Sequence, residues 1–175
     1  MSCSRLEVLQ SAEAAVGLGS NLGDSTQTIS IALQEISRLS GVSLVRTSRL
    51  YKTEPQDFWK QPWFTNAAAK FRVDRDKWSA LDFLRELLRI ETEQGRRRIK
   101  EKGPRTLDLD LLLFGDEQFS GPEITLPHPR MHKRAFVLIP LLEISPELVL
   151  PGGKKLKEYL KDIDYSLEGN QIWQT

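Results

Sequence analysis

The chain has 175 residues and carries 25 Lys and Arg against 24 Asp and Glu, a formal net charge of +1. This length fits one domain, since domains run to roughly 100–200 residues. The balanced charge excludes a protein that is basic all over, as a general nucleic-acid coat would be. The single cysteine, Cys3, excludes an intrachain disulfide and a cysteine-based zinc cluster.

The sequence shows no segment typical of targeting or membrane insertion. Its first residues include Glu7 and Glu13 and lack a continuous apolar stretch, which is unlike a signal peptide. The longest apolar run, at 111–114, is far shorter than the roughly 20 residues of a membrane-spanning helix. We therefore expect a cytoplasmic protein that does not associate with membranes.

Apolar periodicity and turn residues predict the elements in chain order. A buried strand is expected at 14–18, followed by a glycine-rich loop. A helix capped by Asp24 or Ser25 then ends near Gly41. The later elements are strands at 42–53, 64–73 and 107–114, and helices at 79–94, 133–143 and 154–163.

This order, β-α-β-β-α-β, predicts an α+β protein with the ferredoxin-like fold, an antiparallel sheet with helices packed mainly on one face. In the helix at 79–94, the residues Leu81, Leu84, Leu88 and Glu91 fall at helical spacing. The expected boundaries are an N-terminal extension at 1–12, one domain at 13–165 and a flexible C-terminal tail at 166–175.

Basic residues crowd into the segment 96–105, opposed there only by Glu101. Such a density repels itself unless an anion lies among it, and guanidinium groups match phosphate oxygens in pairs. The alternative is a solvated surface loop, which is the usual place for a run of charge. The basic residues are Arg96, Arg97, Arg98, Lys100, Lys102 and Arg105.

Asp108 and Asp110 stand two apart on the predicted strand that follows this basic segment. Alternation places both carboxylates on one face of the strand, roughly 7 Å apart at the backbone. Leu107, Leu109 and Leu111 then lie on the other face. A Mg²⁺ ion would relieve their repulsion, whereas the alternative is an ordinary strand with one wet face. Because the pair adjoins the basic segment, a site for Mg²⁺ and a polyphosphate is favoured.

Three further patterns are weaker. The glycines between Gly17 and Gly23 match neither the P-loop nor the dinucleotide fingerprint, so a tight strand-to-helix turn is expected. His128 lies between two prolines, and with the basic residues after it forms a second basic cluster, either across the site or on the surface. Phe64 and Phe136 could hold a flat heterocycle with Asn66 at its edge, although most Phe side chains belong to the core.

These residues lie in segments that resemble the family of 6-hydroxymethyl-7,8-dihydropterin pyrophosphokinases of folate biosynthesis. The resemblance runs in family order from about residue 14 to about residue 150. It is most specific in the stretch Gly103-Pro-Arg-Thr-Leu-Asp-Leu-Asp-Leu-Leu-Leu-Phe114. The other matching segments are 16–24, 51–55, 64–67, 90–91, 95–96, 126–131 and 134–136.

The resemblance implies a ferredoxin-like enzyme that transfers diphosphate from ATP to the 6-hydroxymethyl group of the dihydropterin and leaves AMP. It implies two Mg²⁺ ions held by Asp108 and Asp110, with Arg96 and Arg105 as further catalytic residues. The implied ATP-binding residues are Glu91, Arg98, Lys100, Lys102, Leu111, Thr125, His128 and Arg134. The implied pterin-binding residues are Thr53, Pro55, Phe64, Asn66 and Phe136.

Two other classes of protein remain as alternatives. A nucleotidyltransferase also uses Gly-Ser and Asp-x-Asp, but close together, whereas Ser20 and Asp108 are far apart in the sequence. A non-enzymatic RNA-binding module would need exposed aromatic residues among basic ones on its middle strands. We expect ATP and the dihydropterin as partners, no nucleic acid, a monomer, and lids at 54–63 and 96–104 that exclude water.

Overall fold

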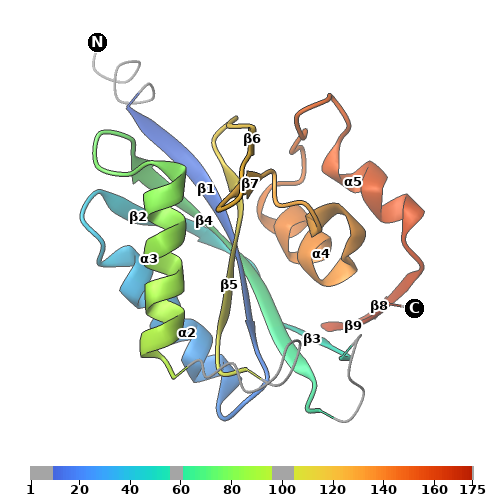
Figure 1. Cartoon of the computed structure of the whole chain (residues 1–175). Helices are drawn as coiled ribbons and strands as arrows, with labels where there is room; N and C mark the ends of the chain where they lie inside the picture. Colours follow the sequence, from blue (N-terminus) through green and yellow to red (C-terminus); the bar gives the residue numbers. More distant parts are fainter. Residues whose placement is uncertain (1–9, 56–60, 96–104, 175) are drawn as a thin grey trace.

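The structure, a computed structural model, describes residues 10–55, 61–95 and 105–174. A seven-stranded sheet forms its centre, with helices on either side (Figure 1). The sheet contains β1 (Ser11–Ser20), β2 (Val42–Thr47), β3 (Tyr51–Thr53), β4 (Phe64–Asp74), β5 (Asp108–Phe114), β8 (Tyr165–Glu168) and β9 (Gln171–Gln174). The other elements are the helices α2 (Ser25–Ser37), α3 (Ala80–Glu93), α4 (Ala135–Ile144) and α5 (Leu156–Tyr159), the 3-10 turns η1 (Met131–Lys133) and η2 (Leu160–Asp162), and the small sheet of β6 (Phe119–Ser120) and β7 (Thr125–Leu126).

The central sheet has the strand order β5-β1-β4-β3-β9-β8, and β2 also pairs with β4. Its pairs are antiparallel apart from β3 with β9, which confirms the predicted α+β class. The predicted strand at 42–53 is divided into β2 and β3. At the break, the Ser48 hydroxyl accepts a hydrogen bond from the Ala68 N–H at 3.0 Å, so a side chain replaces the regular ladder.

Helices cover both faces of the sheet, whereas the sequence pattern predicts them mainly on one (Figure 1). On one face, α2 and α3 pack against apolar residues such as Val16 and Phe71. On the other face, α4 packs against Ala15, Ala68 and Leu112. The central strands are apolar on both sides, which is typical of strands buried between two layers. A second layer of helices is therefore needed to bury the apolar side chains on the other face of these strands.

The two long helices begin at side-chain caps. Asp24 accepts a hydrogen bond from the Gln27 N–H at 3.0 Å at the start of α2, which confirms the predicted cap. In α3, Phe83, Leu87 and Ile90 are buried, as is Glu91 of the spaced set, while Leu88 of that set is 41% exposed. Both sets of residues have helical spacing, so the period alone does not tell which set faces the sheet.

The helices after β5 are shorter than the sequence predicts. The predicted helix at 133–143 begins as α4 at Ala135, after the 3-10 turn η1. The predicted helix at 154–163 is the short α5 followed by η2. No helix in the described parts of the chain is long and apolar enough to cross a membrane.

Residues 165–174 form an ordered hairpin, so the prediction of a flexible tail there is wrong. β8 and β9 pair antiparallel around Gly169 and Asn170, and Gly169 has φ +60°. Two-residue turns with positive φ are typical of hairpins. The side chains at 165–171 are exposed, Ile172 is buried, and Trp173 and Gln174 are half-buried. The hairpin therefore lacks the apolar alternation by which strands are recognised.

Candidate functional site

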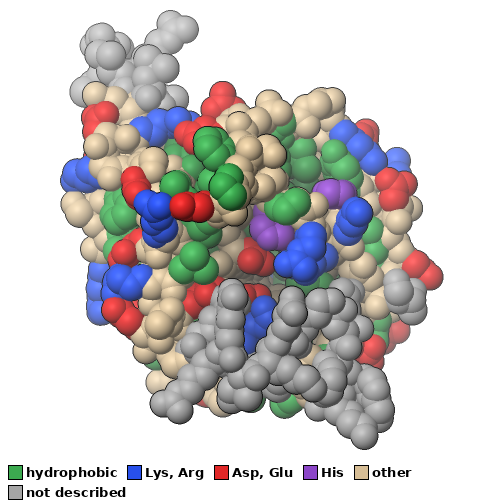
Figure 2. Space-filling view, in the orientation of Figure 1, with side chains coloured by type: hydrophobic (Ala, Val, Ile, Leu, Met, Phe, Trp, Pro, Cys, Tyr) green, Lys and Arg blue, Asp and Glu red, His purple; other side chains and the backbone are tan. Residues whose placement is uncertain are grey.

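Two carboxylates and three basic side chains meet where β5 approaches the beginning of α4. Arg105 Nη1 lies 2.6 Å from Asp108 Oδ2. Asp110 has two more distant neighbours, His128 Nε2 and Arg134 Nη1, each 3.9 Å from one of its oxygens. Figure 2 shows acidic, basic and histidine side chains gathered in the middle of this face. We call these five residues the charged cluster.

Alternation along β5 places the two aspartates as predicted. Leu107, Leu109 and Leu111 are buried in the core beside α2 and α3, so the side chains of Asp108 and Asp110 lie on the face that α4 covers. The segment before α4 is tied to β5, because the N–H of His128 donates to the Leu112 carbonyl at 2.9 Å. The sheet and this segment together build the charged cluster.

Burial and neighbouring charge shift the pKa values of the charged cluster. Burial raises the pKa of Asp110, and repulsion by Asp108 raises it further, while His128, Arg134 and Arg105 act against this. The pKa of His128 is lowered, first by burial and then by nearby arginines, although Asp110 opposes the shift. The pKa of Arg134 is lowered as well, mainly by burial. All three shifts disfavour charge, and oppositely charged ligands would restore it.

A second group of predicted residues lies beside the charged cluster. Asn66 and Thr53 are buried, and Asn66 Nδ2 donates to Thr53 Oγ1 at 2.7 Å. In the sheet register, Asn66 of β4 stands opposite Gly19 of β1, which stands opposite Asp108 of β5. Strands lie roughly 4.8 Å apart, so the backbones of Asn66 and Asp108 are about 10 Å apart.

The sequence pattern predicts that the glycines between Gly17 and Gly23 form a turn, but only part of this prediction holds. Gly17 and Gly19 belong to β1, and Gly23 with φ +66° lies in the turn before α2. A Cβ on Gly19 would stand 2.9 Å from Asn66 Oδ1. The absence of a side chain at Gly19 leaves space for the Asn66 amide on the face of the site.

Two arginines connect the charged cluster with two aromatic rings. The Arg105 guanidinium carbon lies 5.8 Å from the centre of the Phe64 ring, and that of Arg134 lies 5.5 Å from the centre of the Phe136 ring. Both distances are those of cation–π contacts. The predicted pterin-binding aromatics thus adjoin the predicted phosphate-binding residues.

Asn21 is a residue of this region whose role the sequence patterns do not predict. Its own N–H donates to the Arg105 carbonyl at 3.1 Å, and its Oδ1 accepts from the Arg105 N–H at 2.8 Å. Its Nδ2 donates to the Pro62 carbonyl at 3.0 Å. Asn21 thereby connects Pro62 with Arg105, which follows the expected lid 96–104; that lid and residues 56–60 of the other lie outside the described residues. The only signal in the sequence is its place in the Gly-Ser-Asn-Leu-Gly stretch.

Some predicted site residues lie apart from the charged cluster or cannot be placed. Leu111 packs in the core on the opposite face, and Glu91 of α3 is buried where it accepts a hydrogen bond from the Leu109 N–H. Thr125 lies in β7, and Pro55 comes two residues after the end of β3. The predictions for Arg96, Arg98, Lys100 and Lys102 fall outside the described residues.

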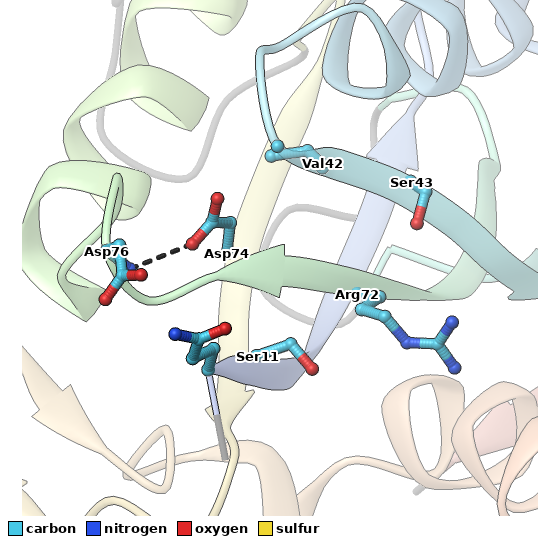
Figure 3. A pocket seen from close by; sticks show the side chains of 8 residues that line it. Ser11, Val42, Ser43, Arg72, Asp74 and Asp76 are labelled. Carbon is cyan, nitrogen blue, oxygen red and sulfur yellow. Dashed lines mark hydrogen bonds between the residues drawn. The ribbon is translucent and has the colours of Figure 1, made fainter. Parts of the chain in front are cut away.

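The surface is also hollowed at the other end of the sheet (Figure 3). This hollow lies beside Ser11, where β1 begins, whereas Gly19 is close to the end of that strand. Eight residues of strand separate them, about 27 Å. Its lining residues are Gln10, Ser11, Gly41, Val42, Ser43, Arg72, Asp74 and Asp76. None of the predicted site residues belongs to it.

The fold defines an α+β protein, and its charged cluster combines two carboxylates with basic groups of the kind that suit phosphate oxygens. The model of the 7,8-dihydro-6-hydroxymethylpterin-pyrophosphokinase (HPPK) family matches residues 15–146. The chain belongs to this family. The resemblance expected from the sequence motifs is confirmed.

Curated relatives carry the corresponding enzyme name. The 2-amino-4-hydroxy-6-hydroxymethyldihydropteridine pyrophosphokinase of Haemophilus influenzae is 45% identical over 148 residues, which cover 85% of this chain and 91% of that protein. The protein of the same name from Pseudomonas aeruginosa is 44% identical over 145 residues, 83% of this chain and 88% of its own length. In Schizosaccharomyces pombe, the folic acid synthesis protein fol1 is 37% identical over 150 residues, 86% of this chain but 20% of that protein.

A solved structure shares the fold. It is described as "Crystal Structure Analysis of the HPPK-DHPS in complex with substrates" and matches with a TM-score of 0.63 over 92% of this chain and 49% of that chain. The two sequences are 9% identical in this match, so the likeness concerns the fold alone.

Proposed function

We infer that this chain transfers the diphosphate of ATP to the 6-hydroxymethyl group of 6-hydroxymethyl-7,8-dihydropterin, giving AMP and the pterin diphosphate in tetrahydrofolate biosynthesis. Family membership and the names of its relatives support this function. The structural observation that carries it is the row Asn66, Gly19 and Asp108 across three neighbouring strands. This row places an amide that could read a ring edge about 10 Å from a phosphate-handling carboxylate.

We propose that Asp108 and Asp110 hold Mg²⁺, two ions with ATP bound. The fit rests on the donors: two carboxylates on one face, one of which has its pKa raised by burial and by the other carboxylate. The described residues bring no third His, Cys, Asp or Glu into a metal-binding group, and Mg²⁺ commonly combines one or two carboxylates with phosphate and water oxygens. The bound ions would neutralise the phosphate charge during transfer.

The basic residues of the charged cluster are proposed to hold the phosphates. Arg105, which pairs with Asp108 in this structure, and Arg134 offer forked donors for phosphate oxygens. His128 Nδ1 accepts a hydrogen bond from the Arg130 N–H at 3.3 Å. Burial lowers the pKa of His128, which favours the uncharged ring before a ligand binds, and an uncharged ring whose Nδ1 accepts carries its proton on Nε2. Nε2 faces the cluster and can donate to a phosphate.

For the acceptor, we propose that Phe64 and Phe136 hold the two faces of the pterin ring and that Asn66 pairs with its edge. The hydrogen bond from Asn66 to Thr53 fixes the amide orientation, leaving Oδ1 to accept from the ring. Arg105 and Arg134 lie between these aromatics and the aspartates. Diphosphate transfer then depends on positioning and charge neutralisation, and no strong base is required.

The structure weakens both alternatives. Ser20 is fully buried and its hydroxyl donates to the Ser25 hydroxyl at 3.1 Å, so it is not open to a nucleotide as the nucleotidyltransferase reading requires. An RNA-binding module of this fold stacks bases on an open face of its sheet. Here helices cover both faces (Figure 1).

We further propose that the enzyme works as a monomer in the cytoplasm, without nucleic-acid partners. The single cysteine suits a reducing compartment.

The function is tested by following AMP formation from ATP, the dihydropterin and Mg²⁺. Asp110→Ala is expected to lower the rate by about 100-fold or more, the size of loss typical when transition-state charge stabilisation is removed. Asp116→Ala is the matched control, because Asp116 lies fully exposed in the turn after β5. Unchanged turnover in Asp110→Ala would contradict the metal site, and release of pyrophosphate instead of AMP would support a nucleotidyltransferase.

A further inference from the structure

The C-terminal hairpin of β8 and β9 packs against the elements that carry the proposed acceptor site. β9 extends the sheet next to β3, and Ile172 stands opposite Thr53 in the parallel register. Ile172 is buried in one cluster with Tyr51, Ala135 and Ile139. The strand therefore contacts both β3 and α4. It also lies beyond residues 15–146, the part of the chain that the family model matches.

Gln174 holds the backbone on both sides of Arg134. Its Oε1 accepts a hydrogen bond from the Ala135 N–H at 2.7 Å, and its Nε2 donates to the Lys133 carbonyl at 2.9 Å. Ala135 begins α4, and the Arg134 side chain makes no capping hydrogen bond there. Gln174 therefore satisfies a free N–H group of the first turn, a role usually performed by the residue before the helix. Gln174 thus contacts the first turn of α4, one residue before Phe136.

Trp173 supports the second aromatic of the acceptor site. Its ring meets the ring of Trp63 edge to face, with centres 5.8 Å apart and planes at 87°, a favourable geometry for aromatic pairs. Trp63 directly precedes Phe64, the first residue of β4. Two neighbouring residues of β9 thus brace the two segments from which Phe64 and Phe136 extend.

We propose that the β8–β9 hairpin positions the acceptor site, with Gln174 and Trp173 setting the separation and orientation of Phe136 and Phe64. The inference rests on the proposed function, because it takes these two rings as the walls that hold the pterin. Gln174 and Trp173 act through Lys133, Ala135 and Trp63, so they are positioning residues. Small misplacements of binding groups weaken productive binding strongly.

The test compares Gln174→Ala with Gln171→Ala in the full chain. Gln171 lies on the same strand but is exposed, so it is a matched control. Loss of the two hydrogen bonds in Gln174→Ala is expected to raise KM for the dihydropterin about 3- to 10-fold. Gln171→Ala is expected to keep the wild-type KM. Gln174→Glu keeps the acceptor for the Ala135 N–H and is expected to recover part of the loss.

The second arm uses Trp173. Trp173→Ala is expected to raise KM for the dihydropterin, because Trp173 contacts Trp63, the neighbour of Phe64. KM for ATP is expected to stay within about twofold of wild type. Trp173→Phe keeps an aromatic edge and is expected to restore most of the affinity. Should Trp173→Ala melt below the assay temperature, Trp173→Leu provides the same comparison without the ring.

The outcomes separate this inference from the proposed function. If the wild-type chain forms no AMP, the proposed function fails. If the wild type forms AMP and Gln174→Ala has the same KM as Gln171→Ala, the function stands and the positioning role is overturned. A merely structural role would lower the melting temperature of Gln174→Ala and leave the KM of the folded enzyme unchanged, which would also overturn it.

Discussion

Gly19 of β1 lies between Asn66 of β4 and Asp108 of β5. A Cβ built on it would stand 2.9 Å from Asn66 Oδ1, a distance that real Cβ atoms essentially never show, and 3.8 Å from Asp108 Cβ. Gly17 lies on the same face of the same strand, but a Cβ there would meet Leu112 at 3.5 Å, ordinary contact. The two glycines therefore differ in what a methyl group would displace.

We predict that Gly19→Ala turns the Asn66 amide out of its place and weakens binding of the dihydropterin. The expected change is a rise of about 10-fold in KM for the dihydropterin, the cost of one or more lost hydrogen bonds. Steady-state kinetics with the dihydropterin varied at saturating ATP would measure it. Gly17→Ala is the control and is expected to stay close to wild type; an equal rise in both variants would contradict the role of Gly19.

Residue patterns predict the charged cluster only in part. The alternation of Asp108 and Asp110 with leucines is a local period, and it correctly places both carboxylates on one face. The contact of Gln174 with the backbone beside Arg134 depends on how β9 docks in the sheet. No local period reports such a contact, because it joins residues far apart in the chain.

At the scale of elements, the strands and helices with strong apolar patterns are predictable and the weakly patterned ones are not. β1, β4, β5, α2 and α3 follow their expected positions, since their apolar residues must be buried somewhere. The sequence pattern does not predict the β8–β9 hairpin, although the turn at Gly169 and Asn170 is a signal for one. The second helical layer is not predicted either, because it depends on packing between elements that are far apart in the sequence.

The connection between β3 and α4 is another contact between elements. Glu143 of α4 accepts hydrogen bonds from the Tyr51 hydroxyl at 2.7 Å and from the Arg49 N–H at 3.3 Å, and it pairs with the Arg49 guanidinium. Burial alone would raise the pKa of Glu143, but these contacts lower it below its ordinary value. A carboxylate whose pKa is lowered in the fold stabilises the fold while it is charged.

We predict that Glu143→Gln lowers the free energy of unfolding by about 1 kcal/mol at pH 7, because hydrogen bonds to a charged, partly exposed group contribute about this much. The contribution of the charge is complete above the ordinary pKa of a glutamate and is lost as the pH falls through the lowered pKa. The difference between wild type and variant is therefore expected to shrink below about pH 4. Urea unfolding at pH 7 and pH 3 measures it.

Glu168→Gln changes an exposed glutamate of β8 and serves as the control. It is expected to leave the free energy of unfolding within about 0.5 kcal/mol of wild type at both pH values. A Glu143→Gln difference that stayed constant between pH 7 and pH 3 would show that the ionised carboxylate is not what stabilises this connection.

At the scale of the whole molecule, the two faces of the central sheet differ in their charge. The core beside α2 and α3 is apolar apart from the buried Glu91, while the face that α4 covers also carries the charged cluster. The formal net charge of +1 hides this local arrangement. Two carboxylates and three basic groups gathered on one face suit a small Mg²⁺-polyphosphate ligand better than a long polyanion, which requires an extended basic surface.

The charge of Asp110 has opposite effects on the stability of the ligand-free fold and on the proposed binding of Mg²⁺. The raised pKa of Asp110 means that its charge is less favourable in the fold than in the unfolded chain, so the charge lowers stability at neutral pH. A neutral amide of the same shape would remove the repulsion with Asp108, but it would also remove a proposed ligand of Mg²⁺.

We therefore predict that Asp110→Asn raises the melting temperature without ligands and reduces the further rise that Mg²⁺ and a non-hydrolysable ATP analogue cause together. For wild type, ligand at about one hundred times its Kd is expected to add about 2.7 kcal/mol, which corresponds to roughly 5–10 °C for a chain of this size. Differential scanning fluorimetry with Mg²⁺, with EDTA, and with Asp116→Asn as the control measures both effects. Because the two effects have opposite signs, a general loss of folding cannot imitate them. A variant with a lowered melting temperature and a wild-type response to Mg²⁺ and nucleotide would contradict the proposed place of Asp110 in the site.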